Sequence, residues 1–275
     1  MERVESILAD LIRIDTSNPP GNEKPAADYL ADLLGRHGIP CRVVEAAPGR
    51  ASFIARLGRG TRRLLFLSHT DVVPAGSGWD FPPFGGEIRD GYVLGRGALD
   101  DKSLVAAEAY VFLRLAEEGR PLNGTLIFVA AADEEAGGRY GLQYLAENLP
   151  EVLEADFAVN EGAPEPVVVK GRPIYFLQVG EKGIAQSRLR TGGRAAHGST
   201  PTLGENAVAK MAEIIGRLAG SAPPVELLPE VRVLFEELAR RLGLPAPTEA
   251  DLDRFLDRFE DRGFREYLRA LTRMT

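Results

Sequence analysis

The sequence predicts an α/β protein in which helices cover a β-sheet, and two features of the chain carry this prediction. Short apolar segments with the length of buried strands alternate with longer segments whose apolar residues recur at helical spacing. Near residue 180 the pattern changes to an alternation of polar and apolar side chains, which is typical of half-buried antiparallel strands. We therefore expect two domains, a larger one over residues 1–181 and a smaller α+β one over residues 182–275.

The larger domain should begin with two amphipathic helices, one ending near Ile14 and one running from about Lys24 to Arg36. Asp90-Gly91 lies between two short apolar segments and predicts a tight β-hairpin. The remaining elements follow from apolar runs and helical spacing. Strands are expected at 41–44, 53–57, 64–67, 126–131 and 157–159, and helices at 102–118 and 141–148.

Two antiparallel strands, Tyr175–Val179 and Ile184–Arg190, are expected on either side of the boundary near residue 180, and the smaller domain should continue with a helix at Glu205–Leu218. Its last part has helical spacing over 231–242 and 251–271. Thr248-Glu249-Ala250-Asp251 resembles a capping box and should mark the start of the last helical stretch.

Composition and charge narrow the classes of function. Apolar residues make up 44% and charged residues 27% of the 275 residues, and no apolar run approaches the ~20 residues of a membrane span. The formal charge of −7, without any basic block, argues against nucleic acid or an anionic membrane as partner. The N-terminus has acids where a signal peptide has a basic stretch, so we expect a cytoplasmic location.

Cysteine usage limits the chemistry of any metal site. Cys41 is the only cysteine, which excludes both an internal disulfide and a cysteine-based zinc cluster. Any metal ion must therefore be held by nitrogen and oxygen atoms.

Residues with metal-binding chemistry follow several of the predicted strands. His69 and Asp71 lie at the end of the 64–67 strand, and residues two apart on an extended chain share a face, so the carboxylate can accept the second N–H of the imidazole. The other residues are acids in loops that follow strands or precede a helix. They are Asp100 and Asp101, Asp133, Glu134 and Glu135, and Glu161.

Each of these signals also has a simpler interpretation. His69 and Asp71 could form a surface pair, and one of the two adjacent aspartates could cap the helix that follows them. Three acids in a row after a strand are commonly a solvated turn, although they repel one another unless a cation neutralises them. Because ligands gather outside the carboxyl ends of strands in open α/β sheets, the shared placement favours one metal site.

Five ordered motifs make the chain resemble the dinuclear zinc aminohydrolases, which include acetylornithine deacetylase, succinyl-diaminopimelate desuccinylase, aminoacylase and carboxypeptidase G. The motifs are SHTDVVP, GRGALDDK, DEE, NEG and AAHGSTP. The resemblance implies a zinc-peptidase-like catalytic domain with a mixed sheet flanked by helices. It also implies a lid and dimerisation domain that is incomplete here.

The resemblance assigns metal ligands to four positions of this chain. Asp100 would bridge two zinc ions, His69 and Glu161 would complete the first, and Glu135 would bind the second. Co²⁺ or Mn²⁺ would be able to replace Zn²⁺.

The resemblance also assigns three roles in catalysis. Asp71 would orient His69, and Glu134 would be the general base that takes a proton from the bridging water. His197, on a loop that by itself reads as merely exposed, would enter the partner subunit's site in a homodimer and stabilise the oxyanion. The expected reaction is hydrolysis of an amide or peptide bond in a small N-acyl amino acid or peptide.

The chain departs from the family pattern in its histidines. Family members supply one more histidine for the second zinc from a C-terminal segment, whereas this sequence has only His37, His69 and His197. His37, near the end of a helix, reads as structural. We therefore expect a truncated form of an amidohydrolase whose complete site binds two zinc ions, with the second zinc position here lacking one ligand. The alternative is an inactive remnant that binds a single metal ion or a partner, and a metal-free glycosidase is disfavoured because it gives the histidine no role.

Overall fold

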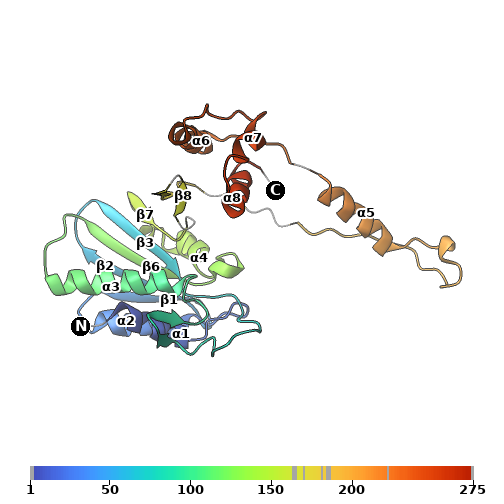
Figure 1. Ribbon diagram of the computed structural model, residues 1–275. Helices are drawn as coiled ribbons and strands as arrows, with labels where there is room; N and C mark the ends of the chain where they lie inside the picture. The colour runs from blue at the N-terminus through green and yellow to red at the C-terminus, as the bar shows by residue number, and fades with distance from the viewer. Residues whose placement is uncertain are drawn as a thin grey trace. The chain divides into compact units, whose positions relative to one another are not determined.

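The first part of the chain folds around a five-stranded sheet with strand order β1-β2-β6-β3-β7 (Figure 1). β6 and β7 run parallel to β3, whereas β1 and β2 are antiparallel to their neighbours, so the sheet is mixed as the sequence implied. The strands are β1 (Cys41–Ala47), β2 (Arg50–Gly58), β3 (Arg63–His69), β6 (Thr125–Ala131) and β7 (Phe157–Val159).

The computed structural model describes residues 3–162, 166–169, 171–180, 182–183, 187–221 and 223–273. The chain forms two compact units, Met1–Gly162 and Ala163–Thr275. None of the described helices combines the length and the apolar character needed to cross a membrane.

Helices cover both faces of the sheet in the first unit. The larger core lies between the sheet and three helices, α1 (Val4–Arg13), α2 (Lys24–Gly35) and α3 (Lys102–Glu118). On the opposite face the sheet packs against α4 (Leu142–Asn148) and a short 3₁₀ turn, η2 (Pro150–Val152). The fold class predicted from the sequence is therefore confirmed.

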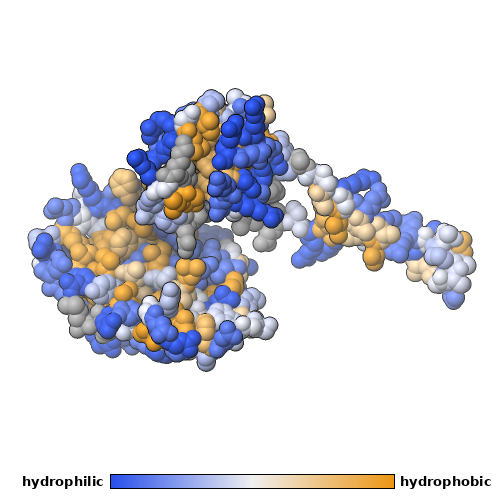
Figure 2. Space-filling view, in the orientation of Figure 1, coloured by the Kyte–Doolittle hydropathy of each residue, from blue (hydrophilic) through white to orange (hydrophobic). Residues whose placement is uncertain are grey.

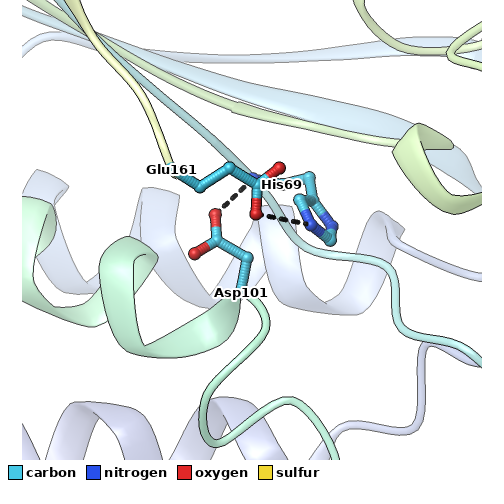
Figure 3. Close-up of side chains that lie close together, drawn as sticks. All are labelled: His69, Asp101 and Glu161. Carbon is cyan, nitrogen blue, oxygen red and sulfur yellow. Dashed lines mark hydrogen bonds and ion pairs between the residues drawn. The ribbon is translucent and has the colours of Figure 1, made fainter. Parts of the chain in front are cut away.

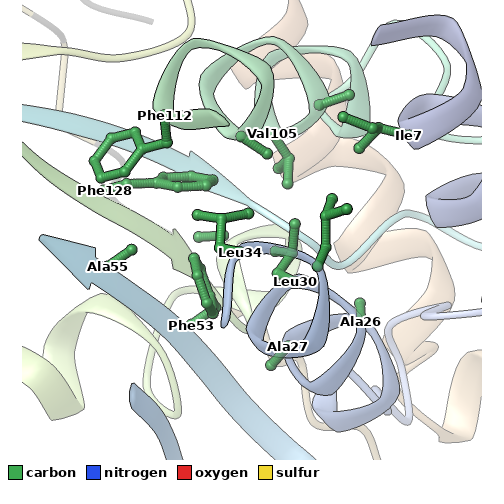
Figure 4. Packing of buried hydrophobic residues seen from close by; sticks show 14 of the residues in the cluster. Ile7, Ala26, Ala27, Leu30, Leu34, Phe53, Ala55, Val105, Phe112 and Phe128 are labelled. Carbon is green, nitrogen blue, oxygen red and sulfur yellow. The ribbon is translucent and has the colours of Figure 1, made fainter. Parts of the chain in front are cut away.

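Strand β6 explains why the sequence shows a continuous apolar run at 126–131. Leu126, Phe128 and Ala130 belong to the core beneath α1–α3, whereas Ile127 and Val129 belong to the core on the α4 side. A central strand that is buried on both faces needs apolar residues at every position. Figure 4 shows Phe128 packed beside Phe53 and Phe112, with ring centroids 5.4 and 5.5 Å apart.

The predicted hairpin is present as β4 (Glu87–Arg89) and β5 (Tyr92–Leu94), which pair antiparallel with Arg89 opposite Tyr92. Asp90 and Gly91 have φ angles of 53° and 85°. A two-residue hairpin loop of this kind needs positive φ at both positions, which the Asp-Gly pair tolerates.

The second unit contains a short hairpin and four helices among its described residues. The hairpin joins β8 (Val167–Val169) to β9 (Arg172–Ile174). The helices are α5 (Ala207–Ala219), α6 (Pro229–Leu242), α7 (Leu252–Leu256) and α8 (Arg262–Leu271), and a 3₁₀ turn, η3 (Pro201–Leu203), precedes α5. Phe235, Phe255, Leu256, Phe264 and Leu268 form part of the core that joins the last three helices.

Several details of the second unit differ from the sequence predictions. Tyr175–Val179 forms no strand, and its residues Tyr175, Leu177 and Val179 are exposed. The predicted strand at 184–190 includes positions 184–186, which lie outside the described residues. The helical stretch 251–271 is two helices, α7 and α8. Asp261 caps the start of α8, where its side chain accepts a hydrogen bond from the N–H of Phe264 at 2.7 Å.

A buried acid links helix α3 to the sheet. Glu108 accepts a hydrogen bond from the hydroxyl of Ser68 at 2.6 Å, and its other carboxylate oxygen has no partner among the described residues. Burial raises the pKa of Glu108 to about 8. The folded protein therefore holds a proton on Glu108 at neutral pH, where an unfolded chain would have lost it.

We expect Phe128→Ala to destabilise the first unit by about 3–5 kcal/mol, because it leaves a cavity at a fully buried position. Urea unfolding followed by the fluorescence of Trp79, the single tryptophan, would measure the change. Phe157→Ala is the matched control, since Phe157 is 76% exposed and its loss should cost less than about 0.5 kcal/mol. Equal effects of the two substitutions would contradict the described core.

We expect Glu108→Gln to change how stability depends on pH. Between pH 4.5 and about 8 the wild-type folded state binds one proton more than the unfolded chain, so its free energy of unfolding falls as the pH rises. Glutamine keeps the acceptor for Ser68 but does not titrate, so the variant should lack this slope, which is at most about 1.4 kcal/mol per pH unit. Urea titrations across this pH range would test it, with the exposed Glu118→Gln as control; parallel curves for Glu108→Gln and wild type would disprove it.

Candidate metal centre

The candidate ligands gather at the carboxyl ends of three neighbouring strands. His69 is the last residue of β3, Glu161 follows β7, and Glu134 and Glu135 lie in η1 (Glu134–Ala136), a 3₁₀ turn just after β6. Because β3, β6 and β7 are parallel, their carboxyl ends meet at one edge of the sheet. Asp100 approaches the same edge from the loop that leads into α3.

The two ring nitrogens of His69 face different partners. Nδ1 lies 3.0 Å from the carbonyl oxygen and 3.4 Å from the carboxylate of Asp71, while Nε2 lies 3.1 Å from Asp100 and 3.6 Å from Glu161. The ring is almost completely buried, so its orientation is fixed. Nε2 is therefore the nitrogen that points at the acids.

Two groups of side chains could hold a metal ion, and His69 belongs to both. One group is His69, Asp101 and Glu161 (Figure 3), and the other is His69, Asp100 and Glu135. In each group the possible ligand atoms lie within 4.8 Å of one another. One imidazole nitrogen binds one ion, so the two groups share a ligand that only one ion can use at a time.

Asp101 is a possible ligand that the sequence interpretation did not assign. It occupies the N-cap position of α3, but its side chain makes no capping hydrogen bond. Instead its carboxylate accepts a hydrogen bond from the backbone N–H of His69 at 3.3 Å. The signal in the sequence was the pair Asp100-Asp101, of which capping explained only one member.

The electrostatics of the cluster show an excess of negative charge. Burial, together with the charges of Glu161 and Asp100, raises the pKa of Asp101 to about 7 although His69 acts in the opposite direction. Burial and neighbouring acids also raise the pKa values of Glu134 and Glu135. Burial disfavours the charged form of His69, but hydrogen bonds to Asp71 and Glu161 outweigh it and raise the pKa of His69 to about 11.

These pKa shifts indicate that a cation fits the residues present. Raised pKa values on acids and on the histidine among them mean that the cluster attracts protons, and a divalent cation would satisfy the same demand. The donor atoms are one imidazole nitrogen and carboxylate oxygens, which suit Zn²⁺, Co²⁺ and Mn²⁺. The donor set therefore fits the metal that the sequence implied.

Asp71 has a second set of contacts that sequence reasoning missed. Its carboxylate oxygens accept hydrogen bonds from the backbone N–H groups of Glu134 and Glu135, at 3.0 and 3.1 Å, and from the side-chain amide of Asn18 at 2.8 Å. Asp71 is fully buried. It thus ties the loop after β3 to the turn after β6.

Lys102 holds the start of α3 in place. Its buried ammonium donates hydrogen bonds to the carbonyl oxygens of Leu11 and Ile14, at 2.9 and 2.7 Å, where helix α1 ends. The carbonyl of Leu11 also accepts the backbone N–H of Ile14 at 3.2 Å, and Ile14 is the residue that follows the helix, so the lysine adds hydrogen bonds where those of α1 end. The contact fixes the chain directly after Asp100 and Asp101.

His197 belongs to the second unit and is exposed. Its Nδ1 lies 2.8 Å from the hydroxyl of Ser199. With Arg194 and Asn206 it lines an open hollow of about 410 Å³. Its predicted role in the active site stays a prediction.

Comparison with known proteins agrees with the fold and the motifs. Residues 65–253 match the model of Peptidase family M20/M25/M40. The chain is 31% identical over 217 residues to a probable succinyl-diaminopimelate desuccinylase of Staphylococcus epidermidis, covering 77% of this chain and 50% of the relative. It is 33% identical over 224 residues to a succinyl-diaminopimelate desuccinylase of Cereibacter sphaeroides, covering 78% of this chain and 56% of that one.

Solved structures show the same fold, and the chain is shorter than its relatives. An M20 family metallo-carboxypeptidase from Sulfolobus solfataricus has a TM-score of 0.65 at 23% identity, covering 93% of this chain and 63% of that chain. A tripeptidase from Staphylococcus aureus has a TM-score of 0.53 at 22% identity, covering 83% of this chain and 58% of that chain. The chain spans about half the length of the curated relatives it matches. With the match over 65–253, these findings show that the chain belongs to peptidase family M20/M25/M40.

Proposed function

We propose that this chain carries the metal site of a hydrolase that cleaves amide or peptide bonds with a zinc-activated water. One observation carries the proposal. A buried histidine and several acids from three strand ends converge at one edge of the sheet, where negative charge is in excess; burial and neighbouring acids raise the pKa of Asp101, and hydrogen bonds to acids raise that of His69. A cation would relieve this excess.

Four residues are proposed as the ligands. Asp100 would bridge two ions, His69 and Glu161 would complete the first, and Glu135 would belong to the second. The contacts of 3.1 and 3.6 Å from His69 Nε2 to Asp100 and Glu161 support the first set. Asp101 is an additional candidate for the first ion, because its carboxylate reaches the same group.

The proposed chemistry assigns separate tasks to metal and protein. Bound zinc would supply the Lewis acidity that lowers the pKa of water and polarises the amide carbonyl. The Glu134 carboxylate, which lies 3.9 Å from His69 Nε2 and is half exposed, would take the proton from the attacking water and pass it to the leaving amine. Asp71 would hold His69 with Nε2 towards the acids.

The proposal extends to substrate and subunit arrangement. A small N-acyl amino acid or peptide is the expected substrate, since the relatives are named as desuccinylases and the structural neighbours as a metallo-carboxypeptidase and a tripeptidase. We propose a homodimer in which His197 completes the partner subunit's site as an oxyanion donor. Helix α5 supports a second copy as partner, because it has no buried residue and exposes Val208, Ile215 and Leu218. Figure 2 shows hydrophobic surface along this helix.

The alternative is an inactive remnant with a single metal ion. It is favoured by the two possible ligand groups among the described residues, which share a single imidazole, that of His69. Zinc content separates the two. Two equivalents with hydrolysis of N-acyl amino acids support the enzyme, whereas one or none without hydrolysis supports the remnant.

We expect Glu134→Ala to keep its metal and to lose turnover about 10²–10⁴-fold, because it removes only the proton carrier. Asp100→Ala should lose metal as well as activity. Zinc content by elemental analysis and hydrolysis of an N-acyl amino acid panel would be measured on the same preparations, with the exposed Glu118→Ala as control. Ordinary activity in Glu134→Ala would rule out the assignment of the base.

We expect removal of metal by a chelator to lower the melting temperature of the first unit and to abolish hydrolysis. Binding to the folded state alone stabilises it by about 2.7 kcal/mol at a free zinc concentration of 100 times Kd. Thermal melts followed by Trp79 fluorescence, before and after adding Zn²⁺ or Co²⁺, would measure the effect. Asp100→Ala should show no such gain; an equal gain in that variant would place the metal elsewhere.

A further inference from the structure

Beside the candidate metal centre lies a group of buried polar side chains that the proposed chemistry does not use. They are Asn18, Glu23, Arg50 and Asp133, and each is at most 8% exposed. Charged residues are rarely buried unless they are paired, because taking them out of water costs several kcal/mol per ion. Their presence here calls for a role that outweighs this cost.

Arg50 is the centre of this group. Its guanidinium donates two hydrogen bonds to the carboxylate of Glu23, at 2.7 and 2.8 Å, and one to Asp133 at 2.6 Å. A fourth goes to the carbonyl oxygen of Pro20 at 3.0 Å. Gly21, which follows Pro20, has a φ of +79°. A Cβ at this position would lie 2.3 Å from the guanidinium carbon of Arg50, so the turn leaves room only for glycine.

Asp133 directly precedes the two glutamates of the site. Its backbone lies in the left-handed region, with φ 67°, and turns the chain from β6 into η1. Its side chain accepts hydrogen bonds from Arg50, from Asn18 and from the N–H of Tyr140, and its own N–H donates to Glu23 at 3.2 Å. The left-handed backbone of Asp133 is unusual for a residue other than glycine, and hydrogen bonds to its side chain and from its N–H hold it in place.

Asn18 connects this group to the metal centre. Its side-chain nitrogen donates to Asp71 at 2.8 Å and to Asp133 at 3.0 Å, which uses both of its hydrogens. Asp71 in turn accepts the backbone N–H groups of Glu134 and Glu135. A neutral amide therefore lies between two carboxylates, where an aspartate would repel both.

We propose that Asn18, supported by Glu23, Arg50 and Asp133, is the positioning residue of the metal centre. It holds the carboxylates of Asp71 and Asp133 in one arrangement, so that the turn after β6 keeps its shape before any metal ion binds. The consequence for catalysis rests on the proposed function. The positioning itself is a property of the metal-free chain and is tested there.

The test is amide hydrogen exchange, followed by NMR on the metal-free protein of 275 residues. In Asn18→Ala the amides of Glu134 and Glu135 should exchange about tenfold faster than in wild type, because Asp71 loses the donor that holds it. The amides of Ile127 and Phe128 in β6 should be unchanged. Asn123→Ala, at an exposed turn, is the matched control and should alter neither pair.

Asn18→Ser is the second variant, because it keeps one donor and preserves the fold if alanine does not. It should speed exchange of the same two amides by less than alanine does. Zinc affinity, measured by competition with a chromophoric chelator, should fall about 10–100-fold in Asn18→Ala, and the absorption spectrum of the Co²⁺-loaded protein should shift.

Two failures can be told apart. Wild-type exchange rates at Glu134 and Glu135 in both Asn18 variants would overturn the positioning role, whether or not the protein is an enzyme. A wild-type protein that binds no zinc and hydrolyses no N-acyl amino acid would overturn the proposed function, and the exchange rates would still decide the role of Asn18.

Discussion

The arrangement of the site depends on the buried carboxylate of Asp71. It contacts the imidazole of His69 on one side and accepts the N–H groups of Glu134 and Glu135 on the other. These groups belong to the ends of β3 and β6, so one side chain ties together the ends of two neighbouring strands. A buried carboxylate without donors would be strongly unfavourable, which means that the loops must adopt the conformation that supplies them. The sheet determines where the strands end, and the hydrogen bonds of Asp71 determine the conformation of the loops that follow β3 and β6.

Much of the fold follows from local patterns in the sequence. Helix α3 has the bounds that helical spacing indicated, and the apolar run at 126–131 is the central strand because a strand buried on both faces needs apolar residues throughout. The hairpin at Asp90-Gly91 follows from the positive φ angles that this pair tolerates. Tyr175–Val179 shows the limit of such patterns. Alternation predicts a strand only where a neighbouring strand supplies backbone hydrogen bonds, and this segment belongs to none of the sheets among the described residues.

The site was predictable in its placement and less so in its detail. His69, Glu134, Glu135 and Glu161 follow strands that the sequence reveals, and parallel strands bring their carboxyl ends together. Asn18 could not be found in this way, because it lies in a turn more than fifty residues before Asp71 and meets it only in the folded chain. Asp101 was visible as one of two adjacent acids. Its carboxylate faces His69 rather than capping α3, which depends on the path of the loop and not on local preference.

The surplus of acids around one imidazole has a consequence for how the site would select among ions. Carboxylates attract any divalent cation by charge, and a concentrated negative field speeds the arrival of all of them alike. Oxygen ligands also suit Mg²⁺ and Ca²⁺, which are hard ions, whereas an imidazole nitrogen favours zinc and its transition-metal neighbours. Discrimination would thus rest on His69, the single nitrogen donor in both ligand groups of the described residues. Charge would attract any divalent cation to the site, and the imidazole of His69 would decide which of them stays bound.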